Sequence, residues 1–116
     1  MISVDRGVRV FLAPGATDMR KSIDTLAILV AGLLDQDPLS GHLFGFCNRR
    51  RDTIKILYWD RNGFCLWHKR LERDRFCWPN NASEARLLSV RELRWLLDGL
   101  SIDQAAHRAL RYEKIC

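Results

Sequence analysis

The sequence predicts one small α+β domain, in which a mainly antiparallel sheet of four to five strands carries one N-terminal helix and one or two C-terminal helices. The chain has 116 residues, which is the length of a single domain. Hydrophobic residues make up 47% and charged residues 28%, a composition typical of a globular chain with a buried core. Segments with strand character fill the middle of the chain, between segments with helical periodicity, and this order indicates the α+β class.

The N-terminal part predicts a strand followed by a helix. Residues 8–12 are apolar and β-branched, and the following Pro14-Gly15 is a turn signal. Apolar residues then recur at helical spacing, at Ile23, Leu26, Ala27, Val30 and Leu34. The helix start is open between Thr17, Asp18 and Ser22, and the Asp37-Pro38 step ends it, because a residue before proline avoids helical dihedrals.

The middle of the chain predicts strands at residues 43–47, 53–59 and 64–71, with a short fourth at 76–78. The Asn-Gly within Asp60–Gly63 is a strong hairpin signal. Strand parity puts Lys55, Leu57, Trp59, Phe64, Leu66, His68 and Arg70 on one face, and Ile54, Ile56, Tyr58, Cys65, Trp67, Lys69 and Leu71 on the other. Both faces are apolar near the turn, so we expect the hairpin to be covered on at least one side. A two-residue register would place Lys55 opposite Arg70.

The C-terminal part predicts a helix that begins at Ser89. Serine followed by glutamate three residues later is a capping box, and the leucines at 93, 96 and 97 share one face. Gly99 is a natural stop, and a weaker box begins at Ser101. We interpret residues 1–100 as the domain and residues 101–116 as a variable C-terminal helix or tail.

The positive charge of the chain is concentrated in one region. The net charge is +5, and residues 49–75 hold nine basic and four acidic residues, which accounts for the whole excess. These cations are candidates for nucleic-acid binding: Arg49, Arg50, Arg51, Lys55, Arg61, Lys69, Arg70, Arg73 and Arg75. The alternative is a solvated hairpin edge protected by charges. Trp59, Phe64, Trp67 and Trp78 could stack bases, but packing in the core is the expected role.

Sequence features of common enzymes are missing. The chain has no phosphate-binding loop, nucleophile elbow or zinc-protease motif, and its acidic residues are not clustered. We therefore expect a protein without catalytic residues, bound metal or cofactor. Only Asp18, Asp24 and Asp60 are named for the alternative, a small metal-dependent nuclease. Four cysteines without a C-x-x-C pair, no signal peptide and no apolar run long enough for a bilayer predict reduced thiols, no membrane contact and a cytoplasmic location.

The stretch Thr17, Asp18, Met19, Arg20 and Lys21 is a second candidate site. It puts two cations beside a helix start, where the helix dipole does not favour positive charge. Two explanations are open: an external anion, or ion pairs within the fold, for example with Asp18.

Several blocks carry a family resemblance, among them Gly7–Leu12, Thr17–Ser22, Ser40–Phe44, Lys55–Asp60, Gly63–Leu66, Lys69–Glu72 and Phe76–Pro79. Through them, residues 1–100 resemble the small accessory transposition proteins (TnpB type, second open reading frame) of the bacterial insertion-sequence sixty-six family. The resemblance implies a non-catalytic companion of a separately encoded transposase, active in DNA transposition. We expect contact with element DNA or with the transposase through the basic hairpin region. The alternative is an adaptor without DNA contact, which uses the apolar hairpin faces and the leucines of the C-terminal helix.

Overall fold

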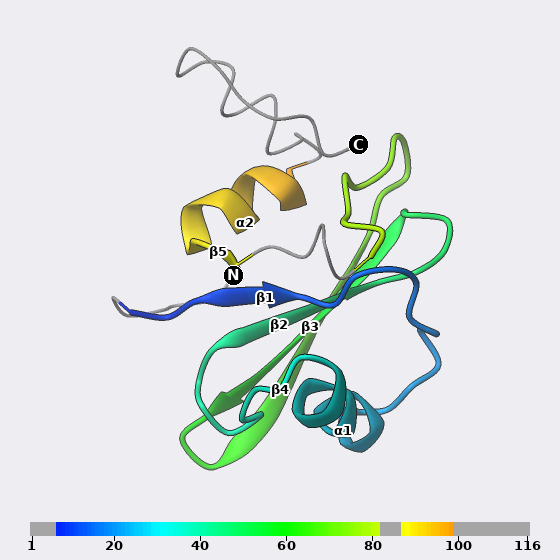
Figure 1. Cartoon of the computed structure of the whole chain (residues 1–116). Helices are drawn as coiled ribbons and strands as arrows, with labels where there is room; N and C mark the ends of the chain where they lie inside the picture. Colours follow the sequence, from blue (N-terminus) through cyan, green and yellow to red (C-terminus); the bar gives the residue numbers. More distant parts are fainter. Residues whose placement is uncertain (1–6, 82–86, 99–116) are drawn as a thin grey trace.

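Five strands and two helices form within residues 7–81 and 87–98, the part of the chain that the computed structural model describes. In chain order they are β1 (Val10–Leu12), α1 (Ile23–Leu33), β2 (Leu43–Cys47), β3 (Thr53–Asp60), β4 (Gly63–Arg70), β5 (Leu87–Leu88) and α2 (Val90–Leu97). The predicted α+β class and the positions of both helices are confirmed (Figure 1). The stop at Gly99 and the box at Ser101 lie outside the described residues.

The sheet is mainly antiparallel but contains one parallel pair. Its strand order is β4-β3-β2-β1-β5, and only β1 and β2 run parallel, with Val10 opposite Leu43. A parallel pair needs a long crossover connection, and α1 with its flanking loops supplies it. This connection puts the segment that follows β1 beside the segment that follows β2.

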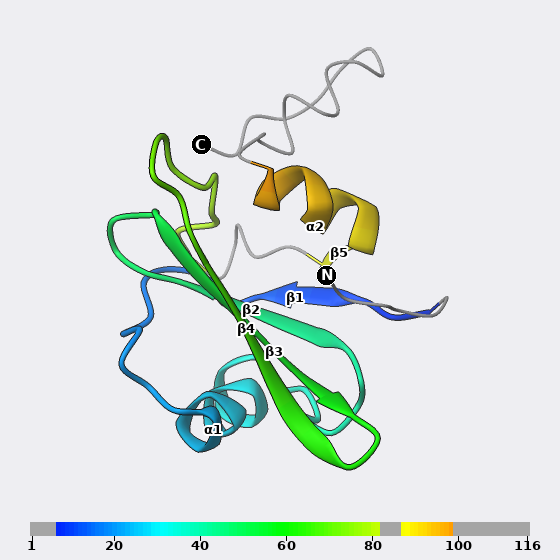
Figure 2. The same cartoon turned by 180° about the vertical axis from the view of Figure 1, so that it is seen from behind.

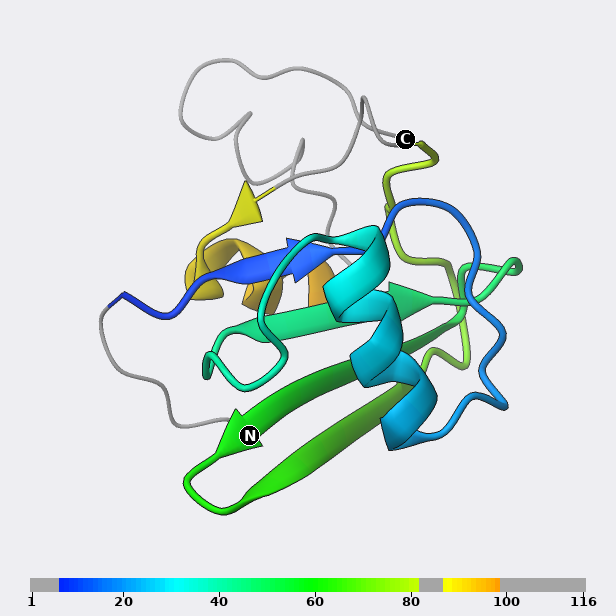
Figure 3. The same ribbon diagram turned by 60° about the horizontal axis from the view of Figure 1, so that its bottom comes forward.

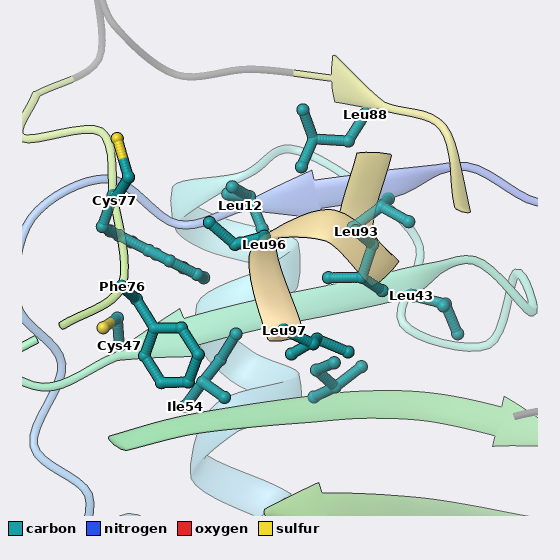
Figure 4. Close-up of a cluster of buried hydrophobic side chains, with 13 residues drawn as sticks. Leu12, Leu43, Cys47, Ile54, Phe76, Cys77, Leu88, Leu93, Leu96 and Leu97 are labelled. Carbon is teal, nitrogen blue, oxygen red and sulfur yellow. The ribbon is translucent and has the colours of Figure 1, made fainter. Parts of the chain in front are cut away.

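Each face of the sheet is covered by one helix (Figure 3). In β3, Leu57 packs with Leu26 and Val30 of α1, whereas Ile54 and Ile56 pack on the α2 side. The α2 side forms the larger cluster, to which Leu12, Leu93 and Leu96 contribute (Figure 4). The alternation follows from the period of two in a strand. The predicted face assignment of the hairpin is therefore confirmed, and the hairpin is covered on both sides.

The predicted pairing of Lys55 with Arg70 is wrong. In the structure Asp60 pairs with Gly63, so Lys55 lies opposite His68 and Arg70 lies opposite Thr53. Arg61 takes the left-handed conformation of the turn, with φ of 55°, while Gly63 already belongs to β4. This register also brings Trp59 and Phe64 into an edge-to-face contact with ring centroids 5.1 Å apart, a cross-strand pair that stabilises a hairpin.

The predicted short strand at residues 76–78 is also wrong. Phe76, Cys77 and Trp78 are all buried, but they belong to none of the five strands of the sheet. Two hydrogen bonds of this segment lead to single loop carbonyls: the Trp78 indole Nε1 donates to Ala13 O at 2.7 Å, and the Phe76 N–H donates to Arg51 O at 2.7 Å. The segment thus packs at one end of the sheet without joining it. The fifth strand is formed by Leu87–Leu88, which pairs with β1.

The cysteines differ from one another in state and burial. Cys47 and Cys65 are free thiols, and burial raises the pKa of Cys47 to about 11. Cys77 is disulfide-bonded, so the expectation of reduced thiols is wrong for this residue. Within the described residues, neither helix is long and apolar enough to cross a membrane.

Candidate functional site

Three loops meet at one end of the sheet: residues 13–22 after β1, residues 48–52 between β2 and β3, and residues 71–81 after β4 (Figures 1 and 2). We call this region the loop end. Backbone hydrogen bonds join the loops: the Thr17 N–H donates to Cys47 O at 2.8 Å, and the Leu71 N–H donates to Asp52 O at 2.7 Å. The β3–β4 turn lies at the opposite end of the hairpin.

Asn48 organises the turn between β2 and β3. Its Oδ1 accepts from the backbone N–H groups of Asp52 and Thr53, both at 3.1 Å, and its Nδ2 donates to the Asp52 carboxylate at 2.7 Å. The Asn48 hydrogen bond is also the main reason why the pKa of Asp52 lies below its usual value. Asparagine side chains that bond to a following backbone stabilise turns of this kind. Arg49 and Arg50 are thereby held, exposed to solvent, at the tip of an ordered turn.

Arg51 links the three loops to one another. Its Nη1 donates to Gly15 O at 3.0 Å, and its Nη2 donates to Asn80 Oδ1 at 2.8 Å. Its own carbonyl accepts the Phe76 N–H, and its backbone is left-handed, with φ of 64°. Arg51 is therefore part of the framework of the loop end.

Two lysines among the predicted nucleic-acid contacts also hold parts of the fold together. Lys55 Nζ donates to Met19 O at 2.5 Å, which fixes the loop before α1 to β3. Lys69 Nζ donates to Leu97 O at 2.6 Å, at the carboxyl end of α2, where the helix dipole favours a cation. The charge of these lysines is thus directed into the protein.

The six remaining predicted cations do not form one patch. Arg49, Arg50, Arg70, Arg73 and Arg75 are exposed at the loop end, whereas Arg61 is exposed at the β3–β4 turn. Strands of this length put about 25 Å between the two ends of the hairpin. Arg50 lies 3.8 Å from Asp52, and Arg70 lies 3.3 Å from Glu72, but exposed ion pairs are weak and leave both cations accessible.

The Thr17–Lys21 motif contains an internal ion pair. The Asp18 carboxylate accepts from Arg20 Nε and Nη2, the latter at 2.8 Å, and from the Arg20 backbone N–H at 2.9 Å. This bonding holds the pKa of Asp18 well below its usual range, so the carboxylate stays ionised over the whole physiological pH range. Thr17 is buried. The sequence left two explanations open, an external anion and an ion pair within the fold. For Arg20 the structure shows the ion pair, with Asp18.

The Thr17–Lys21 motif and the turn between β2 and β3 line one open hollow of about 430 Å³. Its wall consists of Ala16, Thr17, Asp18, Met19, Asn48, Arg49 and Arg50. The two segments are far apart in the sequence, and no local signal relates them. They meet because β1 and β2 are parallel neighbours, whose carboxyl ends lie at the same edge of the sheet, where ligands commonly bind.

The other residues that the sequence named as candidates are either far from one another or buried. Asp18 is paired with Arg20, Asp24 lies in the first turn of α1, and Asp60 lies at the opposite end of β3. Within residues 7–81 and 87–98, no group of three or more His, Cys, Asp or Glu residues could hold a metal ion. Trp67 and Trp78 pack in the α2-side core, as expected. The leucines of α2 are also buried there, so the adaptor surface predicted from them is interior.

These observations define a small α+β domain with exposed cations around a hollow at one end of its sheet. The chain belongs to the family of IS66 Orf2-like proteins, whose family model matches residues 8–107. The predicted resemblance is thereby confirmed, and membership identifies an insertion-sequence accessory protein.

Two relatives come from Sinorhizobium fredii (strain NBRC 101917 / NGR234), and both are uncharacterized proteins. One, y4hO, is 40% identical over 100 residues, which cover 86% of this chain and 87% of the relative. The other, y4jC, is 35% identical over 100 residues, which cover 86% of each chain. No solved structure matches the chain.

Proposed function

We propose that the protein is a non-catalytic accessory factor of transposition that binds the phosphate backbone of element DNA through the loop end and acts beside a separately encoded transposase. The observation that carries this proposal is the hollow shared by Thr17–Met19 and Asn48–Arg50. It joins the Thr17–Lys21 motif to Arg49 and Arg50, two of the exposed arginines.

Charge at the loop end favours a polyanionic partner. Its basic side chains are Arg20, Lys21, Arg49, Arg50, Arg51, Arg70, Arg73 and Arg75, and its acidic side chains are Asp18, Asp52, Glu72 and Asp74. Several guanidinium groups on neighbouring loops match the repeating phosphates of DNA, because each can bind a phosphate through two N–H groups. Contacts of this kind hold a protein on DNA without reading its sequence.

A double variant, Arg49→Ala with Arg50→Ala, tests the proposal. Binding to a fluorescent duplex of the element end is followed by anisotropy over a series of salt concentrations. We expect roughly tenfold weaker binding and a salt slope smaller by about 2, because each lost phosphate contact removes about one counterion. The melting temperature should not change, since both side chains are exposed.

Arg61→Ala is the matched control, because this arginine is also exposed but lies at the far end of the hairpin. It should bind DNA as tightly as the unmodified protein. The proposal is wrong if the double variant keeps its full affinity and salt slope, or if Arg61→Ala weakens binding to the same extent.

A further inference from the structure

The outward face of α1 carries exposed apolar side chains that no residue within 7–81 or 87–98 covers. Leu26 and Val30 face the sheet, whereas Ile28, on the opposite side of the helix, is 70% exposed. Leu33 follows Leu26 by seven residues and so lies on nearly the same side, but it is 54% exposed in the last turn. Leu39, in the loop that follows, is 52% exposed. Figure 3 shows α1 and this loop on the outside of the sheet. Helices that are apolar all round are normally buried, so the pattern indicates a missing partner.

The chain along α1 and the loop after it carries acidic groups only, and Arg20 and Lys21 come directly before it. Within residues 22–41 the charged side chains are Asp24, Asp35 and Asp37, and there is no lysine or arginine. All three aspartates are exposed. Asp24 lies in the first turn of α1, and the other two lie just beyond its last turn, so acidic groups stand at both ends of an apolar surface about 17 Å long.

From this arrangement we infer that the outward face of α1, together with its last turn and the loop that follows, docks a basic amphipathic helix of a protein partner, with apolar side chains against Ile28, Leu33 and Leu39 and with lysines or arginines near the three aspartates. Ala31 and Gly32 are exposed on the same helix, and a Cβ placed on Gly32 would meet no atom within 4 Å. The backbone of α1 is therefore open to close approach by another helix.

The charges distinguish this occupant from two others. A second copy related by a twofold axis would place the same surface against itself and bring aspartates together, because such interfaces are self-complementary. An anionic lipid surface would be repelled by the same three groups. A basic helix satisfies both the apolar centre and the acidic border, and the inference does not depend on DNA binding at the loop end.

Two synthetic peptides of about 18 residues, five helical turns, test the inference. Both carry the same leucine stripe, but one has lysines and the other glutamates at the polar positions. Each is titrated into the full-length ¹⁵N-labelled protein at low and high salt. We expect the lysine peptide to bind and to shift amide signals of α1 and residues 34–41, with weaker binding at high salt. The glutamate peptide should not shift these signals.

Variants of the protein locate the contact. Ile28→Ser should weaken binding of the lysine peptide roughly tenfold, because it removes a central apolar contact, and should leave the melting temperature unchanged. The double variant Asp35→Asn with Asp37→Asn should weaken binding and reduce its salt dependence. Leu87→Ser, which changes a leucine of comparable exposure on β5, is the control and should bind as before.

Three outcomes would overturn the inference. The lysine peptide could fail to shift α1 signals at saturating concentration, or both peptides could bind equally, which would show unselective apolar contact. Sedimentation could also show self-association that Ile28→Ser abolishes, in which case a second copy covers the face. The DNA titrations of the arginine variants are independent of all three outcomes.

Discussion

The two helices cover opposite faces of one sheet, but they differ in how apolar and charged residues are distributed around the helix. In α2, Leu93, Leu96 and Leu97 are buried, while Arg91 and Arg94 face solvent. In α1, Asp24 is the only charged residue, and apolar side chains point both toward the sheet and away from it. The apolar face of α2 is buried against the sheet, whereas α1 has one face without a counterpart in the part of the chain that the structure describes.

The helix starts differ in the same way. Ser89 accepts a hydrogen bond from the Glu92 N–H, and the Glu92 side chain accepts from the Ser89 N–H, so the capping box is complete. Ser22 makes no such cap bond. Local interactions thus support α2, and α1 depends on its packing against the sheet. A helix specified by tertiary packing alone can thus keep a surface for a further molecule.

The strongest test of this contrast removes one apolar side chain from each helix. Leu96→Ala should lower the free energy of unfolding by about 2–5 kcal/mol, because Leu96 is fully buried and its loss leaves a cavity. Ile28→Ala should change it by less than about 0.5 kcal/mol, because the side chain is already in solvent. Urea denaturation measures both values. Equal effects would show that the outward face of α1 is covered in solution.

A smaller effect is expected at the two caps. Ser89→Ala should cost about 1 kcal/mol, since it removes the hydrogen bond to the Glu92 N–H. Ser22→Ala should stay within about 0.5 kcal/mol, because Ser22 lies near only the Thr25 hydroxyl, at 3.4 Å, and caps no backbone group. Both are measured by thermal and urea unfolding. A larger loss for Ser22→Ala would contradict the contrast between the helix starts.

The smallest effect is expected at the helix ends. Asp35 is left-handed, with φ of 52°, and the following Gln36 N–H donates back to Val30 O at 3.2 Å, a closing arrangement that suits glycine. Asp35→Gly should therefore raise the free energy of unfolding, by less than about 1 kcal/mol. Asp98→Gly at the end of α2 is the control, because φ is −81° there and glycine offers no gain. Asp35→Asn separates the conformational effect from the loss of charge.

The candidate site was predicted only in part, because some of its features depend on neighbouring residues and others depend on residues far away in the sequence. The excess of arginines around Arg49 and the motif at Thr17 are visible in the sequence. The sequence does not show that Arg51, Lys55 and Lys69 bond within the fold while the other cations stay exposed. Each of the three donates to a group 28 to 36 residues away. Which carbonyl a lysine meets depends on strand order, and no local pattern encodes strand order.

By itself, the sequence determined both helices, the capping box at Ser89, the alternating faces of the hairpin and the family. These features depend on neighbours within a few residues, through the helical period, the strand period of two and turn chemistry. Only the tertiary structure decided the parallel pairing of β1 with β2, the hairpin register and the path of residues 76–78. Long-range packing on both faces of the sheet selects these arrangements, and it brings Thr17 and Arg49 to one hollow while it leaves Ile28 in solvent.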